Sequence, residues 1–302
     1  MLVFHKVEDI QNHIQDLKIN GKTIGFVPTM GALHEGHLSL IQRSKTECDI
    51  TVASIFVNPT QFNDKKDFDK YPRTNEADSL MLEKSRCDIL FLPNVEEMYQ
   101  NSHLEVQPFD IGYLDTILEG AKRPGHYQGV ATIVEKLFLS VKPDKVYMGL
   151  KDFQQVKVVE KLVRDKDMPI EIVGCPTLRE ANGLAMSSRN MRLSEDGKQK
   201  AGDIYQVLEF IKNHRAIDSP ERVLAQAKEM IVSKGYWDLE YLELRYAHDL
   251  SEIDMEQWQE GVNYVALFAG WLEEVRLIDN RVYEKSVITA HVFVIMAKLQ
   301  AR

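Results

Sequence analysis

Residues 26–40 limit the possible folds of this chain more than any other segment. Residues 22–27 are typical of a short buried strand, and residues 38–41 begin an apolar face at helical spacing. The segment is therefore predicted to pass from a strand into a helix. Gly31 and Gly36 leave room for a phosphate beside the backbone, and the helix start offers unpaired N–H groups and about half a positive charge. We expect an anion to bind there.

Two histidines lie in this segment, three residues apart. His34 and His37 are expected to project from one side of the first helical turn. Either can donate a hydrogen bond to a phosphoryl oxygen, and a protonated one would stabilise charge that builds up on a phosphate. On the residues alone, the alternative is that one histidine caps the helix and the other is a satisfied surface group.

Strand and helix patterns alternate over the first part of the chain. Helices are predicted over residues 7–17, 75–85, 130–141 and 153–164, and strands over 50–57, 87–92, 145–148 and 170–173. This alternation predicts an α/β fold with a doubly wound, Rossmann-like parallel sheet whose ligand lies at the carboxyl ends of the strands.

Beyond about residue 180 the pattern changes. Helices are predicted over 195–213 and 220–234, followed by strands over 239–244, 264–268 and 275–278. We therefore expect a Rossmann-like domain over residues 1–180 and a smaller α+β domain over 181–302 that acts as a lid. The apolar run within residues 287–299 is interpreted as a last strand or packed helix, or alternatively as an interface segment.

The composition argues against several functions. The 302 residues carry 37 Lys and Arg against 46 Asp and Glu, a net charge of −9, so a large nucleic-acid interface is not expected. A small anionic substrate remains possible where local cations gather. No run approaches the roughly 20 apolar residues that span a bilayer, and no signal peptide is recognised, which favours a cytoplasmic protein. Cys48, Cys87 and Cys175 are isolated, as is typical of reduced thiols.

Polar residues that suit an organic acid lie in two of the predicted loops. Asn58 and Gln61 come after the strand at 50–57, where a neutral amide can hold a hydroxyl or a carboxylate, and Asn58 can instead brace the loop. Arg123 stands beside a Pro-Gly turn, from which it can reach an anion. On the residues alone, a plain turn and a solvated arginine are the alternatives.

The segment Gly149-Leu150-Lys151-Asp152 has the order of a phosphate site. Gly149 lets the backbone approach a nucleotide, Lys151 supplies a positive charge, and Asp152 can hold Mg²⁺ directly or through water. Gln155, in the first turn of the next helix, can face an organic substrate. A turn that only caps this helix is the alternative.

A second phosphate-binding pattern is Met186-Ser187-Ser188-Arg189. Its two hydroxyls and one guanidinium can bind a triphosphate and follow the leaving pyrophosphate. A serine-rich capping loop is the alternative.

Taken in order, these motifs resemble the pantothenate synthetase (pantoate-β-alanine ligase) family of the HxGH nucleotidyltransferase superfamily. The similarity runs from about Gly25 to Arg192 and continues more weakly to Asn280. Asn63 departs from the family pattern, because glycine is common at this position. The path of the charged loop at 63–73 depends on which residue stands there. Residues 286–302 are a second departure, because related synthetases usually end not far beyond Asn280.

The resemblance implies condensation of (R)-pantoate with β-alanine to pantothenate through a pantoyl adenylate, with release of AMP and pyrophosphate. It implies ATP and Mg²⁺ as cofactors and a homodimer. The net charge and the lack of a long apolar run, described above, predict no nucleic-acid or membrane partner. Two alternatives are an adenylyltransferase of the same superfamily and a non-catalytic nucleotide-sensing module.

The resemblance also implies roles for individual residues. The implied catalytic residues are His34, His37, Lys151 and Arg189, and the implied pantoate and substrate contacts are Asn58, Gln61, Arg123 and Gln155. The implied metal contact is Asp152. The implied ATP-binding residues are Met30, Gly31, Ala32, Leu33, His34, Glu35, Gly36, His37, Gly149, Leu150, Lys151, Asp152, Leu178, Met186, Ser187, Ser188 and Arg189.

Overall fold

The computed structural model describes residues 1–62, 68–69, 71–99, 106 and 108–284. Two sequence predictions fall outside these ranges. Most of the charged loop after Phe62, including Asn63, is not described, and neither is the apolar run within residues 287–299.

Strands and helices alternate through the N-terminal part, as predicted. The strands are β1 (Leu2–Phe4), β2 (Ile24–Thr29), β3 (Ile50–Ile55), β4 (Ile89–Phe91), β5 (Lys145–Gly149) and β6 (Glu171–Cys175). The helices are α1 (Val7–Ile19), α2 (Glu35–Glu47), α4 (Asn75–Lys84), α5 (Val95–Met98), α6 (Leu118–Lys122), α7 (His126–Val141) and α8 (Phe153–Asp165). The C-terminal part contains α9 (Glu195–Ala201), α10 (Asp203–His214), α11 (Pro220–Val232), β7 (Asp238–Tyr246), β8 (Tyr264–Leu272) and β9 (Val275–Tyr283).

The first six strands form one parallel sheet in the order β1-β4-β3-β2-β5-β6. The chain runs from β2 outward to β3 and β4 and then returns to β5 on the other side of β2, so the order reverses beside β2. In such sheets ligands bind at the carboxyl ends of the strands next to this reversal. The doubly wound α/β fold predicted from the sequence is confirmed.

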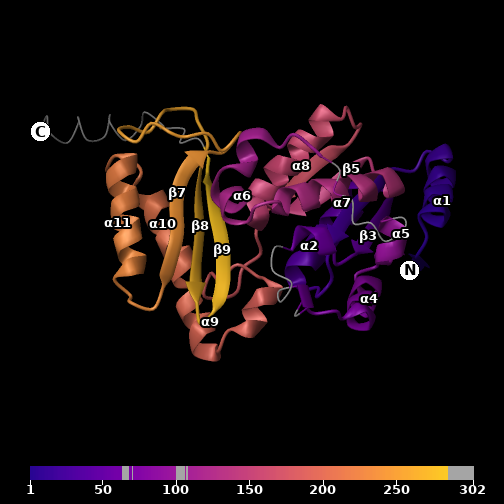
Figure 1. Cartoon of the computed structure of the whole chain (residues 1–302), viewed down its shortest axis with the longest axis horizontal. Coiled ribbons are helices and arrows are strands. Elements are labelled where there is room, and N and C mark those ends of the chain that lie inside the picture. Colours follow the sequence, from indigo (N-terminus) through magenta and orange to yellow (C-terminus); the bar gives the residue numbers. More distant parts are fainter. Residues whose placement is uncertain (63–67, 70, 100–105, 107, 285–302) are drawn as a thin grey trace, which may run out of the picture.

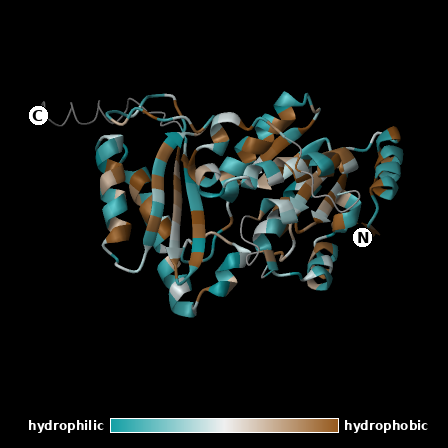
Figure 2. Ribbon diagram, viewed as in Figure 1, coloured by the Kyte–Doolittle hydropathy of each residue, from teal (hydrophilic) through white to brown (hydrophobic). Residues whose placement is uncertain are grey.

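The last three strands form a separate antiparallel sheet, β7-β8-β9, which α10 and α11 cover (Figure 1). The buried residues of α11 recur on one side of the helix, and Figure 2 shows hydrophilic and hydrophobic residues together along its length. This sheet and its helices match the smaller α+β unit that the sequence predicts.

Several element boundaries differ from the prediction. Strand β1 was not predicted, because three residues are too few to show an alternating pattern. Helix α7 begins at His126, four residues earlier than predicted, because Gly125 starts it in a left-handed conformation (φ 80°). The helix predicted over 195–213 is divided at Gly202, where an added Cβ would lie 2.9 Å from the carbonyl oxygen of Asn182.

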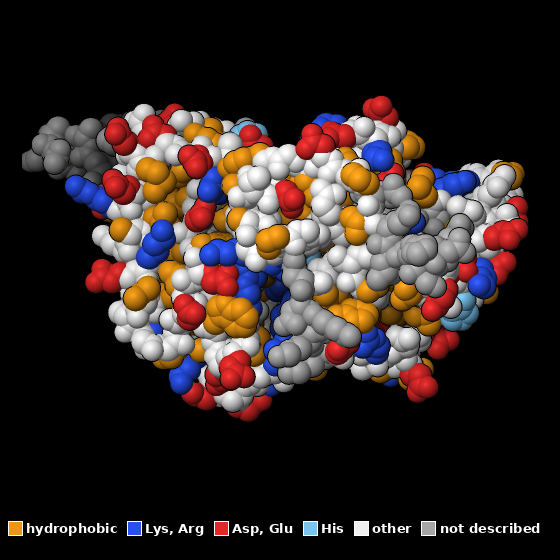
Figure 3. Space-filling model, in the orientation of Figure 1, with side chains coloured by type: hydrophobic (Ala, Val, Ile, Leu, Met, Phe, Trp, Pro, Cys, Tyr) orange, Lys and Arg blue, Asp and Glu red, His pale blue; other side chains and the backbone are white. Residues whose placement is uncertain are grey.

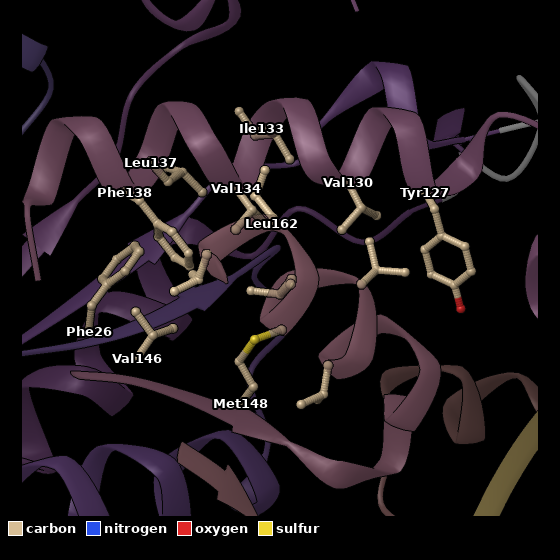
Figure 4. Close-up of a cluster of buried hydrophobic side chains, with 14 of the residues drawn as sticks. Phe26, Tyr127, Val130, Ile133, Val134, Leu137, Phe138, Val146, Met148 and Leu162 are labelled. Atoms are coloured by element: carbon tan, nitrogen blue, oxygen red, sulfur yellow. The ribbon is translucent and has the colours of Figure 1, made fainter. Parts of the chain in front are cut away.

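The largest hydrophobic core lies between the parallel sheet and the helices α1, α7 and α8. Side chains of α7 point toward Phe26 and Val146 of the sheet (Figure 4), and the rings of Phe26 and Phe138 meet edge to face at 6.4 Å. Four buried residues of the C-terminal part, Ala247, Leu250, Val265 and Leu267, belong to this same core. The antiparallel sheet therefore packs directly against the parallel-sheet domain.

Candidate active site

A cavity of about 240 Å³ lies where β2, β3, β5 and β6 end. Figure 3 shows Lys and Arg side chains gathered in the hollow between the two parts of the molecule. Fifteen of the residues implied by the resemblance line this cavity, namely Met30, His34, Gly36, His37, Gln61, Arg123, Gly149, Lys151, Asp152, Gln155, Leu178, Met186, Ser187, Ser188 and Arg189. Residues that are distant in the sequence are thus brought together because the strands are parallel and end at one edge.

The two histidines are fixed by the backbone of their own turn. His34 caps α2, and its Nδ1 accepts a hydrogen bond from the N–H of Gly36 (3.1 Å). Nδ1 of His37 accepts from the backbone N–H of His34 (3.3 Å), and the ring centroids are 4.1 Å apart. Because each Nδ1 is an acceptor, the ring proton of each neutral histidine lies on Nε2. Each Nε2–H is therefore the donor that remains for a ligand.

The charge state of the pair differs from one sequence expectation. Burial, together with the charge of Lys151, lowers the pKa of His34, and burial, reinforced by His34, lowers the pKa of His37 to about 3. Both rings are therefore neutral near pH 7 without a ligand. They can act as hydrogen-bond donors to a phosphate, but in the ligand-free protein the protonated form considered above is not populated at neutral pH.

The turn before α2 is filled by a carboxylate from another helix. Asp78 of α4 is 2% exposed and accepts the backbone N–H groups of Ala32 and Leu33, both at 2.9 Å. An added Cβ on Gly31 would lie 3.0 Å from this carboxylate, and the φ of Gly31 is +83°. The N–H groups of Ala32 and Leu33, which precede the helix, are therefore not offered to a ligand, because the protein supplies its own anion.

A contact within the protein also explains why residue 36 is a glycine. An added Cβ there would lie 2.8 Å from the ring of His34, so glycine leaves room for the capping imidazole. We expected this glycine to make room for a phosphate. Gly36 does line the cavity, but the space beside its Cα is occupied by the ring.

A chain of hydrogen bonds joins the Gln61 loop to Arg123. Nδ1 of His126 donates to the carbonyl oxygen of Gln61 (2.8 Å), so Nε2 accepts from the guanidinium of Arg123 (3.1 Å). Burial and the charge of Arg123 lower the pKa of His126 to about 4, which keeps this acceptor available. Arg123 is thereby oriented at the edge of the cavity.

Asn58 lies beneath the same loop rather than in the cavity. Its Oδ1 accepts from the hydroxyl of Tyr99 (2.7 Å), its Nδ2 donates to the carbonyl of Gly129 (3.1 Å), and the residue is 1% exposed. The structure gives Asn58 a bracing position, which was the alternative considered from the sequence. Gly31, Ala32, Leu33, Glu35 and Leu150 are likewise absent from the cavity lining.

Lys151 and Asp152 lie in the 3₁₀ turn after β5, at the junction of two cavities. A second cavity of about 390 Å³ adjoins the first and extends between the two parts of the molecule. Arg123, Lys151 and Asp152 line both cavities. Burial alone would raise the pKa of Asp152, but the nearby charges of Lys151, Arg189 and Arg123 lower it below its ordinary value. Asp152 is therefore ionised among cations, as a metal contact requires.

The serine and arginine motif begins a short 3₁₀ helix, Ser188–Arg192. Oγ of Ser187 caps it by accepting from the N–H of Arg189 (3.3 Å). Tyr71 also lines the cavity; burial raises its pKa above the ordinary value, and the nearby Ser188 acts against this shift. The motif therefore caps a helix, which was the alternative considered from the sequence, and it also lines the cavity.

Tyr71, Asp78 and His126 are among the residues at or beneath the site that were not predicted. Asp78 carries a recognisable signal, because it is an acidic residue four positions from Leu82 on the buried side of α4. The other two stand in segments that the sequence singled out, but nothing local indicates that they approach the cavity.

Asp152 is compatible with Mg²⁺ that a nucleotide carries. Within the described part of the chain, no three His, Cys, Asp or Glu residues gather as a metal site. Mg²⁺ is often held by one or two carboxylates together with substrate phosphates, so a single carboxylate beside a phosphate site fits this ion. Among the described helices, none is long and apolar enough to cross a membrane.

Comparisons with known proteins agree with this geometry. The family model for pantoate-beta-alanine ligase matches residues 2–282. The pantothenate synthetase of Porphyromonas gingivalis is 45% identical over 284 residues, which cover 94% of this chain and 100% of that protein. The pantothenate synthetase of Bacteroides fragilis is 44% identical over 286 residues, which cover 95% of this chain and 100% of that protein.

Two solved structures extend the similarity to the fold. Pantothenate synthetase from Thermus thermophilus has a TM-score of 0.85 at 40% identity, with 93% of this chain and 99% of that chain covered. A pantoate-beta-alanine ligase from Francisella tularensis, complexed with beta-gamma ATP and beta-alanine, has a TM-score of 0.74 at 34% identity, with 93% and 97% covered.

Proposed function

This chain belongs to the pantoate-beta-alanine ligase family, and we propose that it joins pantoate to β-alanine in two steps through an enzyme-bound pantoyl adenylate. It is therefore a ligase, and the ATP-complexed Francisella relative supports its use of ATP. One observation carries the proposal. Neutral histidines, the cations Lys151 and Arg189, and the amides of Gln61 and Gln155 all line one cavity.

In the first step, the pantoate carboxylate attacks the α-phosphorus of ATP, an anhydride bond to phosphorus forms, and pyrophosphate leaves. The Nε2–H groups of His34 and His37 would donate to phosphate oxygens, while Lys151 and Arg189 would offset the charge on the leaving pyrophosphate. Ser187 and Ser188 would add neutral donors. Mg²⁺, when bound with the triphosphate beside Asp152, would neutralise further phosphate charge.

In the second step, the neutral amine of β-alanine attacks the acyl carbon of the adenylate. An amide bond forms, the acyl–phosphate bond breaks, and AMP leaves. Gln61 and Gln155 can hold the hydroxyl groups of pantoate without adding charge, and Arg123 can hold a carboxylate or a phosphate. No covalent bond to the enzyme is needed, so positioning and electrostatic stabilisation would be its main contributions.

The test separates the two steps. Purified protein is given ATP, Mg²⁺ and pantoate, and pyrophosphate release is measured before and after β-alanine is added. We expect pantoate-dependent pyrophosphate first, followed by AMP and pantothenate only after β-alanine. ATP binding without turnover on either substrate would overturn the proposal. A stable adenylylated product without AMP release would instead indicate an adenylyltransferase.

The family resemblance also leads us to propose a homodimer. Light scattering coupled to size-exclusion chromatography would measure its mass, and a monomer at micromolar concentration would contradict this proposal.

A further inference from the structure

A buried cluster of ionised side chains joins the two parts of the molecule beside the second cavity. It consists of Glu119 of α6, Glu240 of β7 and Arg276 of β9, and is called here the interdomain cluster. Arg276 donates to both carboxylate oxygens of Glu119, at 2.8 and 2.7 Å, and its Nη2 and Nε also donate to Glu240 at 2.8 and 3.1 Å. The side chains are 8%, 19% and 18% exposed for Glu119, Glu240 and Arg276.

A β-bulge provides one member of the cluster. Leu239 is opposite Gly270 and Tyr241 is opposite Ala269, so Glu240 is an extra residue without a partner in β8. A bulge changes the direction of a side chain locally. Glu240 accepts hydrogen bonds from Arg276 and from the indole of Trp271.

The carboxylate of Glu119 is fully engaged in the cluster. Besides Arg276, the hydroxyl of Tyr241 donates to its Oε1 (2.7 Å). Burial alone would raise the pKa of Glu119, but the hydrogen bonds and charge of Arg276 lower it below its ordinary value. Glu119 is therefore a buried anion whose charge is balanced from the C-terminal sheet.

Glu119 is also close to Arg123, which lines both cavities. Arg123 follows four residues later, directly after α6, and both residues line the second cavity. Burial and the charge of Arg189 lower the pKa of Arg123, while the charge of Glu119 acts against them. The guanidinium groups of Arg123 and Arg189 both line the two cavities, and such a pair of cations favours an anionic ligand. Glu119 is a protein anion that can compete for Arg123.

We propose that Arg276 is a positioning residue, which occupies Glu119 so that Arg123 faces an anionic substrate instead of pairing with Glu119. A buried carboxylate that loses its cation is strongly destabilised and takes the nearest replacement. Without Arg276, that replacement is Arg123. The C-terminal sheet thus acts on Arg123 through the ion pair between Arg276 and Glu119. The inference rests on the proposed function for the identity of the substrates.

The test is a cycle of three variants: Arg276→Gln, Glu119→Gln, and the two combined. In Arg276→Gln, Glu119 captures Arg123, so the KM of the anion that Arg123 contacts rises roughly 10- to 100-fold, as for the loss of one charge-assisted hydrogen bond. The kcat changes far less. In the double variant no carboxylate competes for Arg123, so the KM returns toward the wild-type value. A purely structural cluster predicts a double variant at least as impaired as Arg276→Gln.

Separate KM values for ATP and pantoate distinguish the two anions that Arg123 can contact. The matched control is Arg281→Gln. Arg281 lies on the same strand, β9, and its substitution removes an ion pair with Glu209 of α10 but leaves the contacts of Glu119 unchanged. We expect its KM values to remain within about threefold of wild type. A raised KM in this control equal to that of Arg276→Gln would overturn the proposal.

Calorimetric binding of ATP and of pantoate to the same proteins needs no turnover. These binding measurements separate the positioning role of Arg276 from the proposed function. Wild-type protein that binds its ligands but shows no turnover would overturn only the proposed function. If Arg276→Gln does not fold, Arg276→Lys keeps a cation without the forked geometry, and we expect weaker anion binding that Glu119→Gln again restores. Equal affinities across the cycle for both ligands would overturn the positioning role.

Discussion

At the scale of single residues, the site is defined by which ring nitrogen of each histidine is free. The spacing of His34 and His37 predicted that both would face a ligand, because both lie in one helical turn. It did not predict their neutral state, because the pKa of each ring depends on burial by residues from other loops. Local sequence thus indicated which groups are present, and tertiary packing determined their charge.

Substitution of His37 tests its role as a donor. We expect His37→Ala to fold and to lose roughly 10²- to 10³-fold in pantoate-dependent pyrophosphate release, because one preorganised donor to the phosphate is removed. His248→Ala is the control, because the side chain of His248 is 69% exposed and does not line the cavity. Near-normal turnover by folded His37→Ala would exclude this role.

His37 and His126 also make stability depend on pH. The folded pKa values of His37 and His126 are lowered to about 3 and about 4, whereas an unfolded histidine titrates near pH 6.5. Between these values the unfolded chain binds more protons, so the stabilisation is complete above about pH 6.5 and is lost as the pH falls. Urea unfolding between pH 7 and 5 should show this decline.

His126→Gln isolates one of the two contributions. An amide can still donate to Gln61 and accept from Arg123, but it does not titrate. The free energy of unfolding should therefore fall less steeply with decreasing pH, by up to about 1.4 kcal/mol per pH unit. Parallel curves for wild type and variant would show that His126 is not kept neutral by folding.

At the scale of elements, the passage from β2 to α2 was predictable because strand, glycines and helix are contiguous in the sequence. The carboxylate that holds the turn was not, because Asp78 approaches from α4 and only tertiary structure brings it to Ala32 and Leu33. Likewise, the sequence left both a bracing role and a substrate contact open for Asn58, because its partners Tyr99 and Gly129 come from distant segments.

Asp78→Asn measures how strongly α4 holds the turn. The amide keeps one acceptor oxygen for two backbone N–H groups, so one of them loses its partner in a buried position. We expect the free energy of unfolding to fall by about 1–3 kcal/mol in urea titrations. Glu76→Gln, in the same helix but exposed, should change it by less than about 0.5 kcal/mol. Equal effects of the two substitutions would contradict the anchoring role.

At the scale of the whole molecule, the change of pattern near residue 180 predicted a second unit but not how it packs. The contacts depend on the bulge at Glu240 and on which residues of β8 face the large core, and neither is visible in strand patterns. The division at residue 180 and the movement of the second unit as a lid remain predictions. The shared core indicates that the two units are stabilised together.

Leu267→Ala tests this coupling. Leu267 is 5% exposed and extends from β8 into the core of the parallel-sheet domain. Its truncation should lower the free energy of unfolding by about 2–5 kcal/mol and should shift a single calorimetric transition to lower temperature. Two separate transitions, of which only one moves, would show that the units unfold independently.

The carboxylate of Asp78 has a consequence for the cost of binding. A flexible loop that closes around a phosphate must lose conformational entropy, roughly 1–2 kcal/mol for each residue that becomes fixed. Here an internal anion already holds the backbone of Ala32 and Leu33 through two hydrogen bonds. The turn therefore has its final shape before any nucleotide arrives, and free inorganic phosphate finds these two backbone groups occupied. Affinity in this region then depends on the side chains that line the cavity, so it can be altered there without remodelling the turn.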